Sequence, residues 1–174
     1  MKKLEPNLLS NSDIGLSPRY GGFLWEAAAI CLNKRGHGST VNLSGEGHFP
    51  EVYEVSCEAL HERAADSWSD LQEATEYGAT GIALAVLFTE TGMKMKRAYK
   101  GTGIDYWGGV INQGFPFQEK ARIEISGILS GTQNQIDTRL RQKLDQTAAT
   151  SYTGLPAYAA VVEFGNPKIL IGQR

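Results

Sequence analysis

An apolar run near the carboxyl end of the chain constrains its fold more than any other feature. Residues 157–164 read Ala-Tyr-Ala-Ala-Val-Val-Glu-Phe, between Pro156 and Gly165. A strand without polar alternation is typical of a sheet whose two faces are both covered by other elements. The run therefore predicts a central strand in a layered protein.

The segments before this run follow helical and strand patterns in turn. Apolar residues recur at steps of three and four over residues 60–88 and predict a long helix. Strands are expected next over residues 93–99, 104–111 and 120–129. A polar helix is then expected over residues 133–146, followed by the apolar strand over residues 157–164. A short tail follows. The order helix, strand, strand, strand, helix, strand predicts an α/β protein with a mixed sheet flanked by helices.

The first third of the chain adds smaller elements to this core. Residues 1–20 show no periodicity and are expected to form an irregular arm, and an Ala-rich helix is expected over residues 23–32. Two alternating segments at 40–44 and 52–55 predict a hairpin. We expect one domain over residues 1–174, with the arm, helix and hairpin in 1–60 and the α/β core in 60–165.

Composition narrows the class of protein. The chain has 174 residues, enough for one substantial core, and 41% of them are hydrophobic and 21% charged, as in ordinary soluble domains. No apolar run approaches the ~20 residues of a membrane helix, so a cytoplasmic location without membrane contact is the simplest expectation. Cys31 and Cys57 lack metal-site spacing and are expected to be buried thiols.

Two carboxylates stand in strand-like segments of the predicted core. Asp105 follows a Gly-rich bend in Gly103-Ile104-Asp105, and Glu124 opens Glu124-Ile125-Ser126 in the third strand. Element order and acid placement together resemble the restriction-endonuclease-like fold, the PD-(D/E)XK nuclease superfamily. In that family one acid lies near the bend of the second strand and an E-x-K tripeptide on the third. The resemblance covers roughly residues 60–165, with Gly103 in place of a frequent proline and Ser126 in place of the lysine.

The resemblance implies magnesium-dependent hydrolysis of DNA. Asp105 and Glu124 would supply hard oxygen ligands to Mg²⁺, with Glu73 or Glu76 on the preceding helix as further ligands. Ser126 carries no positive charge, so it cannot position the nucleophile and neutralise the transition state as that lysine would. The cation would instead come from Lys120 on the same strand or Lys143 on the following helix. Arg139 is a further candidate.

A basic cluster precedes these acids. It consists of Lys94, Lys96, Arg97 and Lys100, and it forms a candidate nucleic-acid-binding patch although the net charge of the chain is −2. The same lysines are equally typical of an exposed sheet edge. Other interpretations also stay open for the acids. Asp105 could cap a turn, Glu124 could belong to a solvated charge set, and Glu73 and Glu76 could lie on a solvated helix face.

Three hypotheses follow. The first is a metal-dependent DNA nuclease in a restriction or phage-defence system, a setting that comes from the resemblance alone. The second is a catalytically inactive module of the same fold that binds a protein or nucleic acid. Small-residue surfaces at 23–32 and 78–86 would then suit a protein partner or a second copy of the chain. The third is an unrelated α/β interaction protein.

Overall fold

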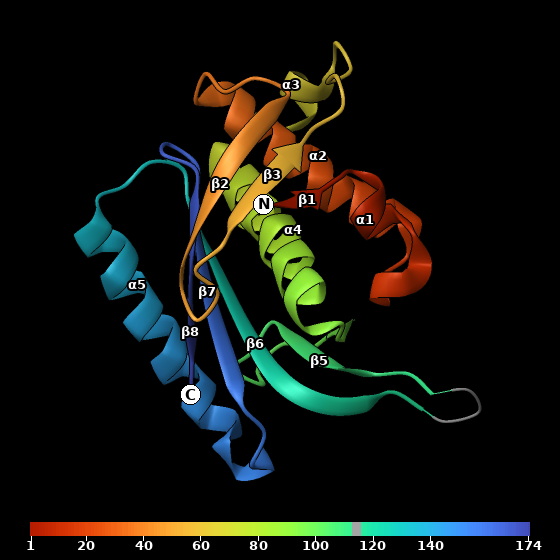
Figure 1. Ribbon diagram of the computed structural model, residues 1–174, viewed down its shortest axis with the longest axis vertical. Helices are drawn as coiled ribbons and strands as arrows, with labels where there is room; N and C mark the ends of the chain where they lie inside the picture. Colours follow the sequence, from red (N-terminus) through yellow and green to blue (C-terminus); the bar gives the residue numbers. More distant parts are fainter. Residues whose placement is uncertain (113–115) are drawn as a thin grey trace.

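One mixed sheet organises the molecule (Figure 1). The computed structural model describes residues 1–112 and 116–174, and the strands in these residues lie in the order β1-β3-β2-β8-β7-β6-β5-β4. The strands are β1 (Lys2–Leu4), β2 (Thr40–Gly47), β3 (Val52–Ser56), β4 (Lys94–Arg97), β5 (Tyr106–Val110), β6 (Gln118–Ile128), β7 (Ala157–Glu163) and β8 (Lys168–Gln173). The α-helices are α1 (Asn7–Ser10), α2 (Pro18–Lys34), α3 (Ala64–Ser67), α4 (Leu71–Thr91) and α5 (Gln133–Gln146), with 3-10 helices η1 (Ser12–Ile14) and η2 (Thr147–Thr153).

Helices cover both faces of the sheet, which confirms the predicted mixed α/β class. Helix α5 packs on β6, β7 and β8, whereas α4 packs on β6 and β7 from the other face and α2 packs against α4 (Figure 1). Strand β7 is buried along its whole length between these layers. This explains the apolar run of its sequence.

The core follows the predicted order of elements. Strands β4, β5 and β6 form an antiparallel meander, and α5 then crosses over so that β7 pairs with β6 in parallel. Helix α5 has the predicted bounds. Its start is fixed by a capping box in which Thr132 and Gln135 satisfy each other's backbone N–H groups.

The expected tail is instead strand β8, so that prediction was wrong. This strand pairs antiparallel with β7 and parallel with β2, and it joins the hairpin of β2 and β3 to the core. Ile169 and Ile171 are buried in the core, while intervening residues are partly exposed. The sequence offers only the short apolar run Ile169-Leu170-Ile171 after a turn, which is a weak signal for a strand.

The prediction of an irregular arm over residues 1–20 was also wrong. Strand β1 pairs in parallel with β3, and the Lys2 ammonium lies 2.6 Å from the Glu90 carboxylate at the end of α4. Tyr53 donates a second hydrogen bond to Glu90 at 2.7 Å. The arm also contributes the first turn of α2, where the Ser17 side chain caps the helix and Pro18 takes its first position.

Helix α4 is shorter than the predicted helix of residues 60–88. Asp70 caps its start by accepting hydrogen bonds from the backbone of Gln72 and Glu73. The residues before it form the separate short helix α3, which ends at Ser67 with Trp68 as its cap. Gly92 ends α4 in the left-handed conformation. The small residues of α4 pack closely on α2, because a Cβ on Gly78 would lie 2.9 Å from the Ala28 Cα atom. These surfaces therefore bury each other inside the chain, and the hypothesis that they contact another subunit was wrong.

The close approach of α2 and α4 gives a stability prediction. Gly78→Ala is expected to lower the free energy of unfolding by about 2 kcal/mol, because the new methyl group overlaps backbone atoms of α2. Gly22→Ala is the matched control, since its Cβ meets no atom within 4 Å. It is expected to stabilise α2 by up to about 1 kcal/mol. Urea denaturation of both variants measures the difference, and equal stabilities would rule out the tight helix contact.

Candidate functional site

The candidate site lies where β5 separates from β6. The two strands pair from Val110↔Gln118 to Tyr106↔Ile123, and β6 then continues to Ile128 with no strand paired on that side among the described residues. Asp105 stands at this fork. Its backbone N–H donates to the Ile123 carbonyl oxygen at 2.9 Å, and its Oδ2 atom accepts from the Ile125 N–H at 2.8 Å. The carboxylate therefore bridges two strands, which excludes the turn-cap interpretation.

Glu124 is buried beside Asp105. Glu124 is only 6% exposed, so the interpretation that it belongs to a solvated set of charged side chains was wrong. Burial raises the pKa of Glu124, the hydrogen bond from Lys143 lowers it, and the neighbouring Asp105 raises it by charge repulsion and by a side-chain hydrogen bond. Together these effects place the pKa of Glu124 at about 7. Two carboxyl groups that interact in this way form one acidic centre at the fork.

A lysine from α5 completes this centre. The Lys143 Nζ atom lies 2.7 Å from Glu124 Oε1, and the two side chains are 19% and 8% exposed. Lys120, the candidate on the strand itself, is exposed and does not line the cavities at the fork. The α5 crossover thus places a lysine ammonium beside Glu124. Ser126 in turn accepts a hydrogen bond from Arg139 Nη1 at 2.9 Å.

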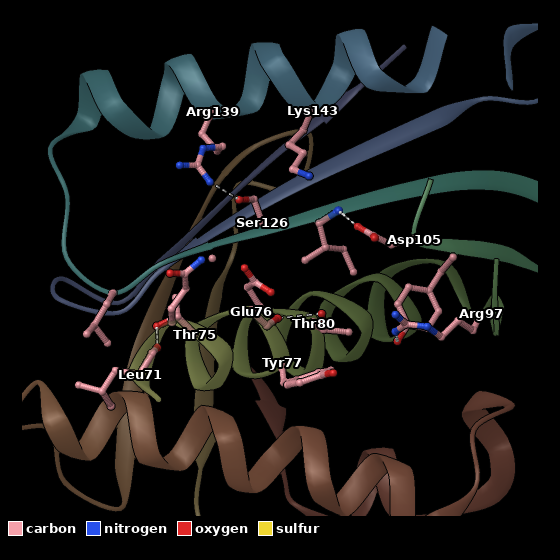
Figure 2. Close-up of a pocket in the computed structure, with 15 residues that line it drawn as sticks. Leu71, Thr75, Glu76, Tyr77, Thr80, Arg97, Asp105, Ser126, Arg139 and Lys143 are labelled. Atoms are coloured by element: carbon pink, nitrogen blue, oxygen red, sulfur yellow. Dashed lines mark hydrogen bonds between the residues drawn. The ribbon is translucent and has the colours of Figure 1, made fainter. Parts of the chain in front are cut away.

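Two cavities meet at these residues. One of about 590 Å³ lies between α4 and α5 along the unpaired edge of β6, and the other, of about 680 Å³, lies beneath the loop after β4. Both are lined by Arg97, Asp105 and Lys143. Figure 2 shows Arg139 and Lys143 reaching down from α5 toward the first cavity while Glu76 reaches up from α4. The volumes of both cavities fall in the range of about 300–1,000 Å³ that is typical of ligand sites.

The remaining candidates divide between this site and the surface. Glu73 and Glu76 are both exposed on α4, and Glu76 also lines the first cavity whereas Glu73 lies outside both cavities. Lys100 lines the second cavity. Lys94 lies over the Phe88 ring of α4, and the Lys96 Nζ atom lies 3.5 Å from Glu119 Oε1 on β6. The basic cluster is therefore split, with Arg97 and Lys100 at the site and the two other lysines on the edge of the sheet.

Sequence reasoning missed the partners of Arg97. Its Nη1 atom donates to the hydroxyl groups of Tyr20 and Tyr106 at 2.9 and 3.0 Å, and these hydroxyls lie 2.6 Å apart. Tyr20 comes from α2, in the segment expected to be an arm. Nothing local in the sequence relates it to Arg97, because the contact depends on how α2 packs beside the meander.

The two carboxylates could bind a magnesium ion only if water molecules supplied most of its ligands. In the described residues, no group of three or more His, Cys, Asp or Glu side chains is arranged to hold a metal. Asp105 Oδ1 and Glu124 Oε2 nevertheless accept no protein N–H hydrogen bond in the part of the chain that the structure describes. Mg²⁺ typically keeps several waters and takes one or two carboxylates, so this donor set suits it.

Comparison with known proteins gives no information on the function of this site, so its interpretation depends on the chemistry of its residues. No family model, curated protein or solved structure matches the chain. No helix in the described residues is both long enough and apolar enough to cross a membrane. The arrangement of Asp105, Glu124 and Lys143 is therefore the principal basis for a functional proposal.

The raised pKa of Glu124 predicts a pH-dependent stability of the metal-free protein. A carboxyl group with a raised pKa binds its proton more tightly after folding, so its stabilising effect is complete below the ordinary glutamate pKa and is lost as pH rises through about 7. In EDTA, we expect the unfolding temperature to fall more between about pH 5 and about pH 8 for wild type than for Glu124→Gln. Glu73→Gln, at an exposed position of α4, should behave like wild type. Identical pH profiles for wild type and Glu124→Gln would show that the group is not perturbed.

Proposed function

We propose that this protein is a metal-dependent nuclease that hydrolyses phosphodiester bonds in DNA. The observation that carries the proposal is the convergence of Asp105, Glu124 and Lys143 at the fork of β5 and β6. Two adjacent carboxylates with a cation beside them provide the groups that metal-assisted hydrolysis of a phosphodiester needs. The order of core elements agrees with the restriction-endonuclease-like resemblance, from which the proposed restriction or phage-defence setting also comes.

Each residue has a distinct part in this proposal. Asp105 and Glu124 would hold Mg²⁺ through the oxygens that face away from Ile125 and Lys143, and the bound ion would polarise the phosphate and acidify a water molecule. The backbone of β6 fixes Asp105 through the Ile125 N–H. Lys143 would orient the nucleophile and offset negative charge on the phosphate. Glu76 faces the same cavity from α4 as an additional carboxylate.

Cleavage of DNA in the presence of a divalent ion tests this proposal. Wild-type protein is incubated with supercoiled plasmid, linear duplex and single-stranded DNA in Mg²⁺, in Mn²⁺ and in EDTA. Cleavage in either metal and none in EDTA is expected. An Asp105→Ala preparation, purified identically, reveals contamination if it cuts as fast as the wild type. Failure to cut any of these DNAs in either metal would count against the nuclease.

The competing proposal is a catalytically inactive module of the same fold. One observation favours it: Lys143 already neutralises Glu124 at 2.7 Å, as in a closed structural ion pair. Such a module would bind nucleic acid or a protein without hydrolysis. Tight DNA binding in Mg²⁺ with intact DNA recovered afterwards would support the module over the nuclease.

A further inference from the structure

Two arginines of the first cavity carry charges that no carboxylate offsets at close range. Arg97 and Arg139 both line this cavity, and neither has an Asp or Glu oxygen within 4.0 Å in the described residues. The other cation of the cavity, Lys143, is paired with Glu124. The cavity therefore keeps two guanidinium groups available to an anion, beside an acidic centre that repels one.

Neutral hydroxyl groups hold each guanidinium in place. Arg97 is fixed through Nη1 by Tyr20 and Tyr106, and burial raises the pKa of Tyr106 well above its ordinary value, so the phenol stays uncharged. Arg139 is fixed through Nη1 by Ser126. In each case the other donors of the guanidinium remain for a second partner. Orientation without neutralisation is suited to binding an anion that arrives from solution.

The two arginines lie on either side of Asp105 in the view of Figure 2. In Figure 2, Arg139 descends from α5 at one end of the cavity, Arg97 stands at the other end beside the meander, and Asp105 lies between them. They come from separate elements, so their placement depends on the whole fold. A strand of nucleic acid whose scissile phosphate lay at Asp105 would present its neighbouring phosphates toward these two ends.

We propose that Arg97 and Arg139 are phosphate-binding residues that hold a nucleic-acid strand on either side of the Asp105–Glu124 centre. Guanidinium groups bind phosphate oxygens through parallel hydrogen bonds, which a strand with regularly spaced phosphates can satisfy at two points. The identity of the anion as a nucleic-acid phosphate rests on the proposed function. A purely internal role, in which the arginines offset Glu76 and Asp105 through the cavity, predicts no contribution to binding.

Binding without cleavage tests this proposal. Fluorescence anisotropy of a labelled single-stranded oligonucleotide, and of the matching duplex, is measured in EDTA while salt is raised from about 50 to about 200 mM. Arg97→Met and Arg139→Met should each weaken binding several-fold. For the single strand, each should also reduce the slope of log affinity against log salt by about 0.7, as expected when one phosphate contact is lost. The form bound more tightly by wild type identifies whether a single strand or a duplex enters the site.

Matched variants separate local contact from overall charge. Arg141→Met changes an exposed arginine on the helix that carries Arg139, and Arg19→Met changes an exposed arginine on the helix that carries Tyr20; neither arginine lines the cavity. Both should keep the wild-type slope. Equal loss in these controls, an unchanged slope in Arg139→Met, or no oligonucleotide binding by wild type would each overturn the proposal. Because the assay contains no metal, arginine-dependent binding by a protein that never cuts DNA would uphold the phosphate site and reject the nuclease.

Discussion

Asp105→Asn is expected to reduce Mg²⁺-dependent DNA cleavage by about a thousandfold. A metal ion contributes several kcal/mol of transition-state stabilisation, and about 1.4 kcal/mol corresponds to a factor of ten in rate. The amide oxygen can still accept the hydrogen bond from the Ile125 N–H, so the fork of β5 and β6 should keep its structure. The variant therefore removes the charge that would hold the ion while preserving the fold.

Initial cleavage rates of wild type and Asp105→Asn, measured on the same plasmid, give the comparison. Asp137→Asn is the matched control, because Asp137 is an exposed carboxylate on α5 outside both cavities. It should cut at the wild-type rate. If Asp105→Asn retained full activity with unchanged circular dichroism, the chemistry would have to be placed elsewhere in the molecule.

Lys143→Met is expected to lower the cleavage rate by about a hundredfold, the loss typical of removing one charge-stabilising donor. The hydrogen bond from Lys143 lowers the pKa of Glu124, so its removal should raise that pKa above about 7. Cleavage that needs an ionised Glu124 should then require a higher pH than in the wild type. A pH–rate profile of the variant, shifted toward alkaline pH, records this effect.

Lys120→Met is the decisive control for the lysine. Both lysines were candidates in the sequence, but only Lys143 reaches Glu124. The Lys120 variant should retain the rate and pH profile of the wild type. Loss of activity in Lys120→Met with full activity in Lys143→Met would reverse the assignment of the cation.

Regular local patterns made much of the fold predictable. The bounds of α5 follow from Thr132 at its cap and an apolar stripe through Ile136 and Leu140, and both are readable within one short window. Strand β8 and the elements of the first 20 residues were missed, because they are short and are stabilised by partners distant in the chain. The contact between Lys2 and Glu90 illustrates this, since the two residues are 88 positions apart in the chain.

The positions of the acidic residues at the candidate site could be predicted from the sequence, whereas the positions of its cationic residues could not. Asp105 directly precedes β5 and Glu124 lies on the neighbouring strand β6 of one meander, so their order in the sequence already places them together. The choice of Lys143 depends on where α5 crosses β6, and the orientation of the Arg97 guanidinium depends on Tyr20 in α2. Such contacts are set by the packing of layers, which no local sequence pattern encodes.

Calorimetric titration with Mn²⁺ tests the central claim, a divalent-ion site built from Asp105 and Glu124. Wild-type protein should bind the ion at one site, and Asp105→Asn should bind it at least about tenfold more weakly, as expected when a ligand is lost. Asp137→Asn should titrate like wild type. Equal Mn²⁺ affinity in wild type and Asp105→Asn, or no binding by wild type, would contradict the site.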